Sequence, residues 1–139
     1  MKKLALPLAL AALTAGCANV SNMSQSELRG YSTAQLCSTY GGVHGGGWTN
    51  TRPPNVRQAI QRKGDITDRE WSAINRRSVF VGMSEAALLC SWGTPNFYGG
   101  VNQTRTANTL SKQYVYRGCS GCRADYVYIE NGKVRAIQN

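Results

Sequence analysis

The dipeptide Asn131-Gly132 is the sequence feature that most restricts how this chain can fold. It separates residues 125–130, DYVYIE, from residues 133–137, KVRAI. Asparagine followed by glycine favours the two-residue turn of a β-hairpin, because both residues tolerate a positive φ. Two further stretches with β-strand character, residues 101–106 and 113–117, precede this hairpin. The carboxyl-terminal part of the chain therefore predicts an antiparallel β-meander.

Alternation within residues 125–130 predicts that the meander has two different faces. Tyr126 and Tyr128 fall on one face, and Val127 and Ile129 fall on the other. We expect the aliphatic face to pack against helices, since an antiparallel sheet commonly buries one face only. The tyrosines of the sheet are candidate binding residues: Tyr114, Tyr116, Tyr126 and Tyr128.

Helical patterns come before the strands. Residues 32–40 and 55–63 each predict a helix that ends at glycine, and a further helix starts at Thr67, where Thr67 and Glu70 form a capping box. Ser84 caps the last helix, which Gly93 and the following proline end. We expect the second and third helices to form an interrupted helical hairpin, and residues 78–81 to form a short strand.

The order of these elements predicts an α+β fold, with short helices on one face of a small antiparallel meander. The chain has 139 residues, of which 42% are hydrophobic, as in one ordinary globular domain. Residues 41–54, rich in glycine and ending in two prolines, predict a surface loop that holds His44 and Trp48. His44 is the single histidine of the chain, so we expect no catalytic or metal-binding role for it.

The first 16 residues predict a signal peptide. Lys2 and Lys3 precede an apolar run, residues 4–13, and three small residues precede Cys17. The run is too short to cross a hydrocarbon core as a helix, which takes about 20 residues. The order Ala-Gly-Cys resembles the bacterial lipobox, which implies cleavage before Cys17, acylation of that cysteine by chains such as palmitate, and a membrane anchor. Ala18 at the next position resembles the pattern of lipoproteins sent to the outer membrane.

Composition divides the rest of the chain into three parts that we expect to form one compact unit beyond the anchor. Residues 17–30 are mostly small or polar and predict a lipidated tether. Residues 31–77 predict a helical extension, and residues 78–139 hold the last helix and the meander.

Basic residues follow the predicted helices. Cleavage before Cys17 leaves 14 basic and 7 acidic side chains, a formal net charge of +7. Two interpretations stay open: a solvated face, or a patch that binds anionic lipid headgroups through Arg57, Arg62 and Lys63. We do not expect nucleic-acid binding, since an exported protein does not ordinarily meet the DNA or cytosolic RNA of its own cell and the sequence holds no recognisable nucleic-acid-binding motif.

Four cysteines remain after Cys17, an even number that predicts disulfides in an oxidising compartment. Of the three possible connectivities we favour Cys37 with Cys90 and Cys119 with Cys122, because the second pair flanks a turn between two strands. The Cys-x-x-Cys spacing also admits redox chemistry or metal binding. Redox motifs of the thioredoxin kind lie at a helix amino terminus, and zinc needs two more ligands, so we favour structural disulfides and expect no cofactor.

The carboxyl-terminal half resembles the small outer-membrane lipoproteins of the SmpA/OmlA/BamE-like family. The resemblance covers residues 78–139 and lies in the order of Gly82-Met83-Ser84, Leu88-Leu89, Gly93-x-Pro95, Tyr114 and Tyr116, and the closing segment 126–134, YVYIENGKV. It implies helices packed on an antiparallel sheet, an outer-membrane location facing the periplasm, and a role in outer-membrane organisation. The extension 31–77 and the cysteines are not part of this pattern.

Three functions are consistent with the sequence. We favour a membrane-anchored envelope lipoprotein that binds or scaffolds a protein partner and catalyses no reaction, because the sequence has no recognisable catalytic motif. A thiol-active periplasmic protein that uses Cys119 and Cys122 is the first alternative. A lipoprotein inhibitor of an envelope enzyme is the second.

Overall fold

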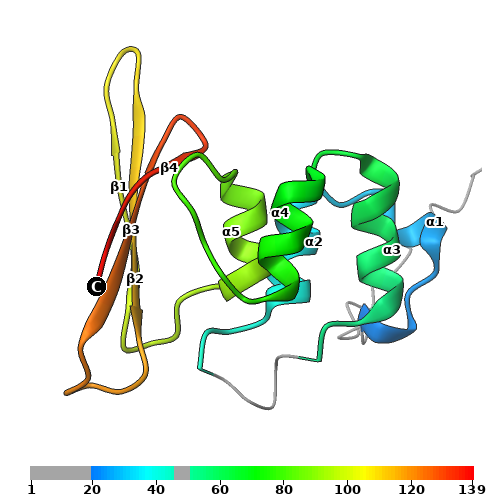
Figure 1. Cartoon of the computed structure of the whole chain (residues 1–139). Coiled ribbons are helices and arrows are strands. Elements are labelled where there is room, and N and C mark those ends of the chain that lie inside the picture. The colour runs from blue at the N-terminus through cyan, green and yellow to red at the C-terminus, as the bar shows by residue number, and fades with distance from the viewer. Residues whose placement is uncertain (1–19, 46–50) are drawn as a thin grey trace, which may run out of the picture.

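The computed structural model describes residues 20–45 and 51–139; Cys17, Trp48 and the predicted signal peptide lie outside them. The fold is α+β, as the sequence predicts (Figure 1). In chain order the elements are η1 (Val20–Asn22), α1 (Gln25–Leu28), α2 (Thr33–Gly41), α3 (Pro54–Lys63), α4 (Asp68–Asn75), α5 (Glu85–Trp92), β1 (Gly100–Arg105), β2 (Leu110–Arg117), β3 (Ala124–Glu130) and β4 (Lys133–Gln138).

The strands form the antiparallel meander that the sequence predicts, in the order β1-β2-β3-β4. Asn131 and Gly132 both have positive φ, at 47° and 80°, which the turn between β3 and β4 requires. Val127 is fully buried and Ile129 is 2% exposed, whereas Tyr126 and Tyr128 are only half-buried. The predicted division of β3 into an aliphatic face towards the helices and a tyrosine face away from them is confirmed.

Helices α2 and α5 lie against each other at the centre of the helical layer. Glycine permits their close approach: a Cβ on Gly41 would lie 1.9 Å from the carbonyl oxygen of Leu89, and one on Gly93 would lie 2.3 Å from that of Gly42. Real side chains cannot approach a backbone atom so closely. The backbones of the two helices therefore touch where one ends in Gly41 and the other is followed by Gly93.

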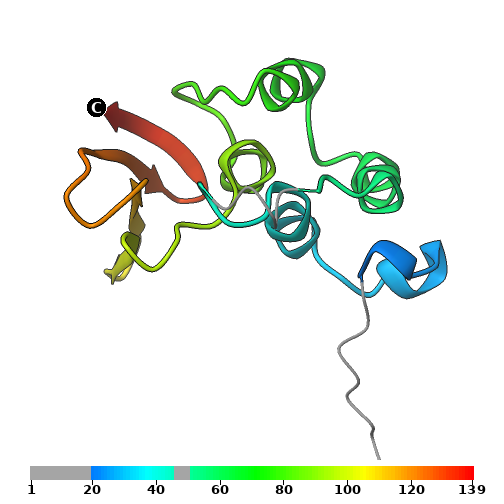
Figure 2. The same cartoon turned by 90° about the horizontal axis from the view of Figure 1, so that it is seen from below.

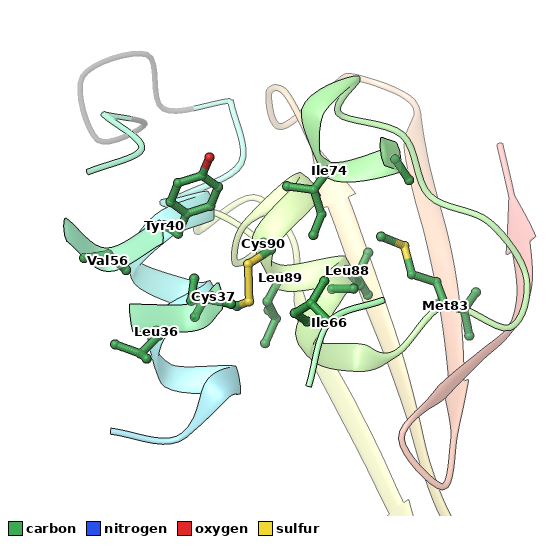
Figure 3. Close-up of a cluster of buried hydrophobic side chains, with 14 of the residues drawn as sticks. Leu36, Cys37, Tyr40, Val56, Ile66, Ile74, Met83, Leu88, Leu89 and Cys90 are labelled. Carbon is green, nitrogen blue, oxygen red and sulfur yellow. A yellow bond between two sulfur atoms is a disulfide. The ribbon is translucent and has the colours of Figure 1, made fainter. Parts of the chain in front are cut away.

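The disulfide between Cys37 and Cys90 joins the same two helices (Figure 3). Both half-cystines are completely buried. In the close-up the yellow bond lies within the apolar cluster, among Leu36, Leu88 and Leu89. The core of the protein thus centres on the α2–α5 pair.

The other two long helices flank this pair. Helix α3 packs on α2, and α4 packs on α5. The expected helical hairpin of residues 55–63 with the following helix is therefore wrong as a packing unit, because each helix buries its apolar side on a different partner. The buried residues include Val56 and Ile60 of α3, and Ala73 and Ile74 of α4.

Glu70 connects α4 to α5. The predicted capping box is present: Glu70 accepts hydrogen bonds from the backbone N–H of Thr67 at 2.9 Å and from its hydroxyl at 3.1 Å. The Glu70 side chain also accepts a 2.6 Å bond from the N–H of Ser84, the residue that caps α5. Burial by itself raises the pKa of Glu70, but the hydrogen bonds from Thr67 and Ser84 outweigh it and lower the pKa below its ordinary value of 4.5.

Substituting Glu70 with glutamine should lower the free energy of unfolding at pH 7 by about 2 kcal/mol, because a buried, charge-assisted set of hydrogen bonds is lost. A carboxyl whose folded pKa is depressed stabilises the fold above its unfolded pKa, and that stabilisation fades as the pH falls through the range below about 5. Urea unfolding across pH 3 to 7 measures both effects. Glu27→Gln is the control, since it removes the same kind of capping box from the exposed start of α1; equal losses in the two variants would contradict the role of burial.

Residues 78–81 do not form the strand expected of them. The backbone groups of Ser78 bind the helices on either side of this segment. Its N–H donates to the carbonyl of Ala73 at the end of α4, and its carbonyl accepts from the hydroxyl of Ser91 in α5. Because these groups are bound to helix α4 and to a side chain of α5, the segment connects two helices instead of joining the sheet.

Residues 20–30 do not behave as the tether that composition predicts. Leu28 is completely buried, and Val20 and Met23 pack against the core cluster. The side-chain amide of Asn55 donates to the carbonyls of Val20 at 2.9 Å and Met23 at 3.0 Å. Hydrogen bonds and apolar contacts therefore fix this segment on α3, so residues 20–30 belong to the described fold.

The helices α1 and α3 lie at the end of the molecule opposite to the sheet (Figures 1 and 2). Figures 1 and 2, at right angles to each other, both place α1 and α3 at one end and the meander at the other, with α2, α4 and α5 between them. Within the described residues no helix is long and apolar enough to cross a bilayer. The start of the described chain is thus at the end remote from the sheet.

Candidate functional site

A groove with a basic rim lies between α1 and α3, at the end of the molecule remote from the sheet. It has a volume of about 280 Å³, and we call it the basic groove. Leu28 and Ala59, at 0% and 6% exposure, give it an apolar floor. Its rim consists of the polar and basic residues Gln25, Arg29, Arg62 and Lys63.

The cations of the basic groove have no carboxylate partner among the described residues. Arg62 donates to the side-chain oxygen of Gln25 at 3.4 Å, and the ammonium group of Lys63 donates to the carbonyl of Arg29 at 3.5 Å. The two ion pairs within 4 Å that occur in the described part of the chain both lie elsewhere. Arg62 and Lys63 also stand in the last turn of α3, where the helix dipole favours positive charge. The groove can therefore receive a small anion, such as a phosphate group, without displacing a described carboxylate; Arg62 and Lys63 would give up only their long bonds to Gln25 and Arg29.

Two of the three predicted lipid contacts belong to this groove, and one does not. Arg62 and Lys63 lie on its rim, but the guanidinium of Arg57 stacks over the ring of Trp71, 4.6 Å from its centroid. Arg57 also donates to the hydroxyl of Tyr40 at 2.9 Å. The guanidinium of Arg57 is thus engaged between α2 and α4, away from the basic groove, and its role as a headgroup contact stays a prediction. The third basic residue of the groove is Arg29, which lies in the predicted tether.

Tyr114 and Tyr116 are not surface residues, contrary to their selection as binding candidates. They are 6% and 1% exposed and point towards the helices. The hydroxyl of Tyr114 donates to Glu85 at 2.5 Å, and that of Tyr116 donates to the carbonyl of Gly93 at 3.0 Å. Burial raises the pKa of both hydroxyls, so they stay protonated donors. Both tyrosines fix α5 on the sheet.

Tyr126 and Tyr128 do lie on the face of the sheet that the helices leave uncovered. On that face a chain of polar side chains crosses all four strands: Asn102 donates to Gln113 at 3.0 Å, Gln113 to Tyr128 at 3.2 Å, and Tyr128 to Gln138 at 3.3 Å. A shallow groove of about 360 Å³ lies beside it. This face offers amide and phenol groups to a partner, but these groups already bind one another.

The second disulfide, Cys119 with Cys122, lies in the turn between β2 and β3. Cys119 is exposed and Cys122 is partly exposed, whereas the Cys37–Cys90 bridge is buried. Both pairs are those that the sequence favoured. The turn holds no helix amino terminus that would lower a thiol pKa. Among the described residues no three His, Cys, Asp or Glu side chains come together as a metal site requires.

Sequence reasoning missed an exposed apolar cluster at the start of β1. Phe97 is 86% exposed, Val101 46% and Tyr98 39%, and the rings of Phe97 and Tyr98 have centroids 3.9 Å apart. Nothing in the local pattern distinguishes these residues from buried ones, because exposure here depends on where the helices end. No known protein family, characterised protein or solved structure matches the chain.

Proposed function

We propose that the protein is an envelope lipoprotein, anchored in the outer membrane through an acylated Cys17, that faces the periplasm and binds or scaffolds a protein partner without catalysing a reaction. The resemblance of residues 78–139 to the SmpA/OmlA/BamE-like lipoproteins supports a role in outer-membrane organisation. The observation that supports the proposal is that the described fold begins at Val20, three positions after Cys17.

Only three residue steps separate Cys17 from Val20, where the described fold begins. A fully extended chain spans at most ~3.6 Å per residue, so this link reaches about 11 Å. Acyl chains on Cys17 would enter the hydrocarbon, and the end of the domain that holds η1 and α1 would then lie in the headgroup layer. The domain would rest on the membrane instead of hanging from it.

This arrangement would bring the basic groove to the headgroups. Its Arg29, Arg62 and Lys63 carry charge that no described carboxylate neutralises. Each basic residue near an anionic surface contributes about 1 kcal/mol to binding. The sheet would project away from the membrane, where its open face can reach a periplasmic partner (Figure 1).

Metabolic labelling with a palmitate analogue tests the anchor. The wild-type protein should carry the label and fractionate with outer membranes, and Cys17→Ala should lose both properties while keeping its fold. Absence of label from the wild-type protein would overturn the anchor and with it the proposed function.

Vesicle binding by the unacylated Cys17→Ala protein tests the orientation. Replacing Arg29, Arg62 and Lys63 with glutamine should weaken binding to vesicles rich in phosphatidylglycerol about tenfold or more. The matched control replaces Arg105, Arg123 and Lys133 at the sheet end, which removes the same charge and should have a smaller effect. Equal losses in the two triple variants would contradict a membrane-facing groove and indicate attraction by net charge alone.

The exposed Cys119–Cys122 turn favours thiol–disulfide exchange as a second candidate function. An insulin-reduction assay distinguishes the two. Under the scaffolding proposal the purified protein adds nothing to the rate given by the reductant alone, and replacing both cysteines with serine changes nothing. A faster rate that requires both cysteines would favour the thiol-active alternative.

A further inference from the structure

The two edges of the sheet differ in how they are protected. At the β4 edge the N–H of Gly82 donates to the carbonyl of Val134, and the N–H of Val134 donates to the carbonyl of Met83, both at 2.8 Å. The pairing of β3 with β4 is also irregular between Tyr128 and Ile129. Bonded segments and bulges are the devices by which proteins prevent an edge strand from pairing with another chain.

The β1 edge has none of this protection among the described residues. Its six residues, 100–105, pair with β2 in an unbroken register and contain no proline or lysine. Residues 101–108, which include the strand after Gly100 and the turn that follows it, are exposed. The backbone bonds outside regular elements include none from residues 100–105. An edge strand presents a row of free N–H and C=O groups on its outer side, and in Figure 1 the β1–β2 hairpin extends beyond the helices.

The side chains along β1 give this edge an apolar end and a charged end. Val101 pairs with Tyr114 and so lies on the helix-facing side of the sheet, and the exposed rings of Phe97 and Tyr98 precede it. Gln103 and Arg105 follow on the same side, because alternate residues of a strand share a face. Arg105 forms no ion pair with a described residue.

We propose that β1 binds an extended segment of a partner protein by strand addition, and that this segment carries an apolar residue beside Val101 and a carboxylate beside Arg105, four positions apart. The chain after cleavage before Cys17 has a formal net charge of +7, which repels a second copy and attracts an acidic segment. The partner's backbone would take the free N–H and C=O groups of β1, and its side chains would provide selectivity. This inference rests on the proposed function, because it specifies the kind of protein partner that the scaffold would bind.

The test titrates the isotope-labelled Cys17→Ala protein with the acetylated peptide Thr-Glu-Thr-Thr-Thr-Val-Thr, whose Glu and Val match an antiparallel strand. Backbone amide shifts should be confined to β1 and the turn before it. A peptide with Lys in place of Glu should bind about fivefold more weakly. Arg105→Glu, an exposed substitution that leaves the core intact, should reverse this preference, whereas Arg135→Glu at the opposite edge should not.

Absence of β1 shifts, equal binding of both peptides, or concentration-dependent dimerisation through β1 in place of peptide binding would overturn the inference. The peptide titration uses the unacylated protein, so its outcome does not depend on palmitate labelling. A failure of strand addition at β1 can therefore be distinguished from a failure of the proposed membrane anchor.

Discussion

Gly41→Ala is expected to lower the free energy of unfolding by about 3 kcal/mol, near the upper end of the range for overpacking a core. The added methyl group would lie 1.9 Å from the carbonyl oxygen of Leu89 and 2.8 Å from the Cα of Gly93. Both obstacles are backbone atoms, so no side-chain rotation relieves the clash and α2 must move away from α5. Denaturant unfolding followed by circular dichroism measures the loss.

Gly121→Ala is the matched control for this substitution. Gly121 lies in the exposed turn between β2 and β3, and a Cβ there meets nothing within 4 Å. Gly121→Ala should leave the free energy of unfolding nearly unchanged. If Gly41→Ala were equally neutral, the close contact of α2 with α5 would be wrong.

Removing the buried disulfide, by Cys37→Ala with Cys90→Ala, is expected to lower the free energy of unfolding by about 4 kcal/mol in the chain-entropy account. Its cysteines are 53 positions apart, so the bridge restricts a long loop of the unfolded chain. It also joins the two helices at the centre of the core (Figure 3). Urea unfolding of the purified double variant, under oxidising conditions, gives the difference.

The exposed disulfide provides the comparison. Cys119 and Cys122 are three positions apart, and the same account gives about 2 kcal/mol for so short a loop. The alanine double variant of this pair should therefore unfold at a higher urea concentration than that of the buried pair. The reverse order would show that loop length and burial do not govern the stabilisation here.

Local signals in the sequence were sufficient wherever a few neighbouring residues determine the backbone. Asn131-Gly132 fixed the β3–β4 turn, Thr67 with Glu70 fixed the start of α4, and Ser84 fixed the start of α5. These signals work because a capping hydrogen bond or a positive φ needs nothing beyond the adjacent residues. The pairing of the cysteines could also be predicted from the sequence, since it required only the order of the predicted helices and strands.

The tether shows where a local signal was present but was outweighed by composition. Ser24 and Glu27 form a complete capping box at the start of α1, yet the polar residues around them predicted an unfolded link. The burial of Leu28 depends on α3, which lies about 30 positions further along the chain, and no local pattern indicates that contact. Because residues 20–30 pack on α3, Arg29 lines the basic groove together with Arg62 and Lys63.

The sequence by itself determined the α+β class, the meander, the starts of α4 and α5 and the two disulfides, because each depends on periodicity, turn chemistry or the order of elements. Only the tertiary structure decided that Arg57 stacks on Trp71, that Tyr114 and Tyr116 face inward, and that β1 is the open edge. Those features depend on which surfaces distant elements cover. Side-chain periodicity indicates which residues share a face, but only packing determines whether that face is buried or exposed.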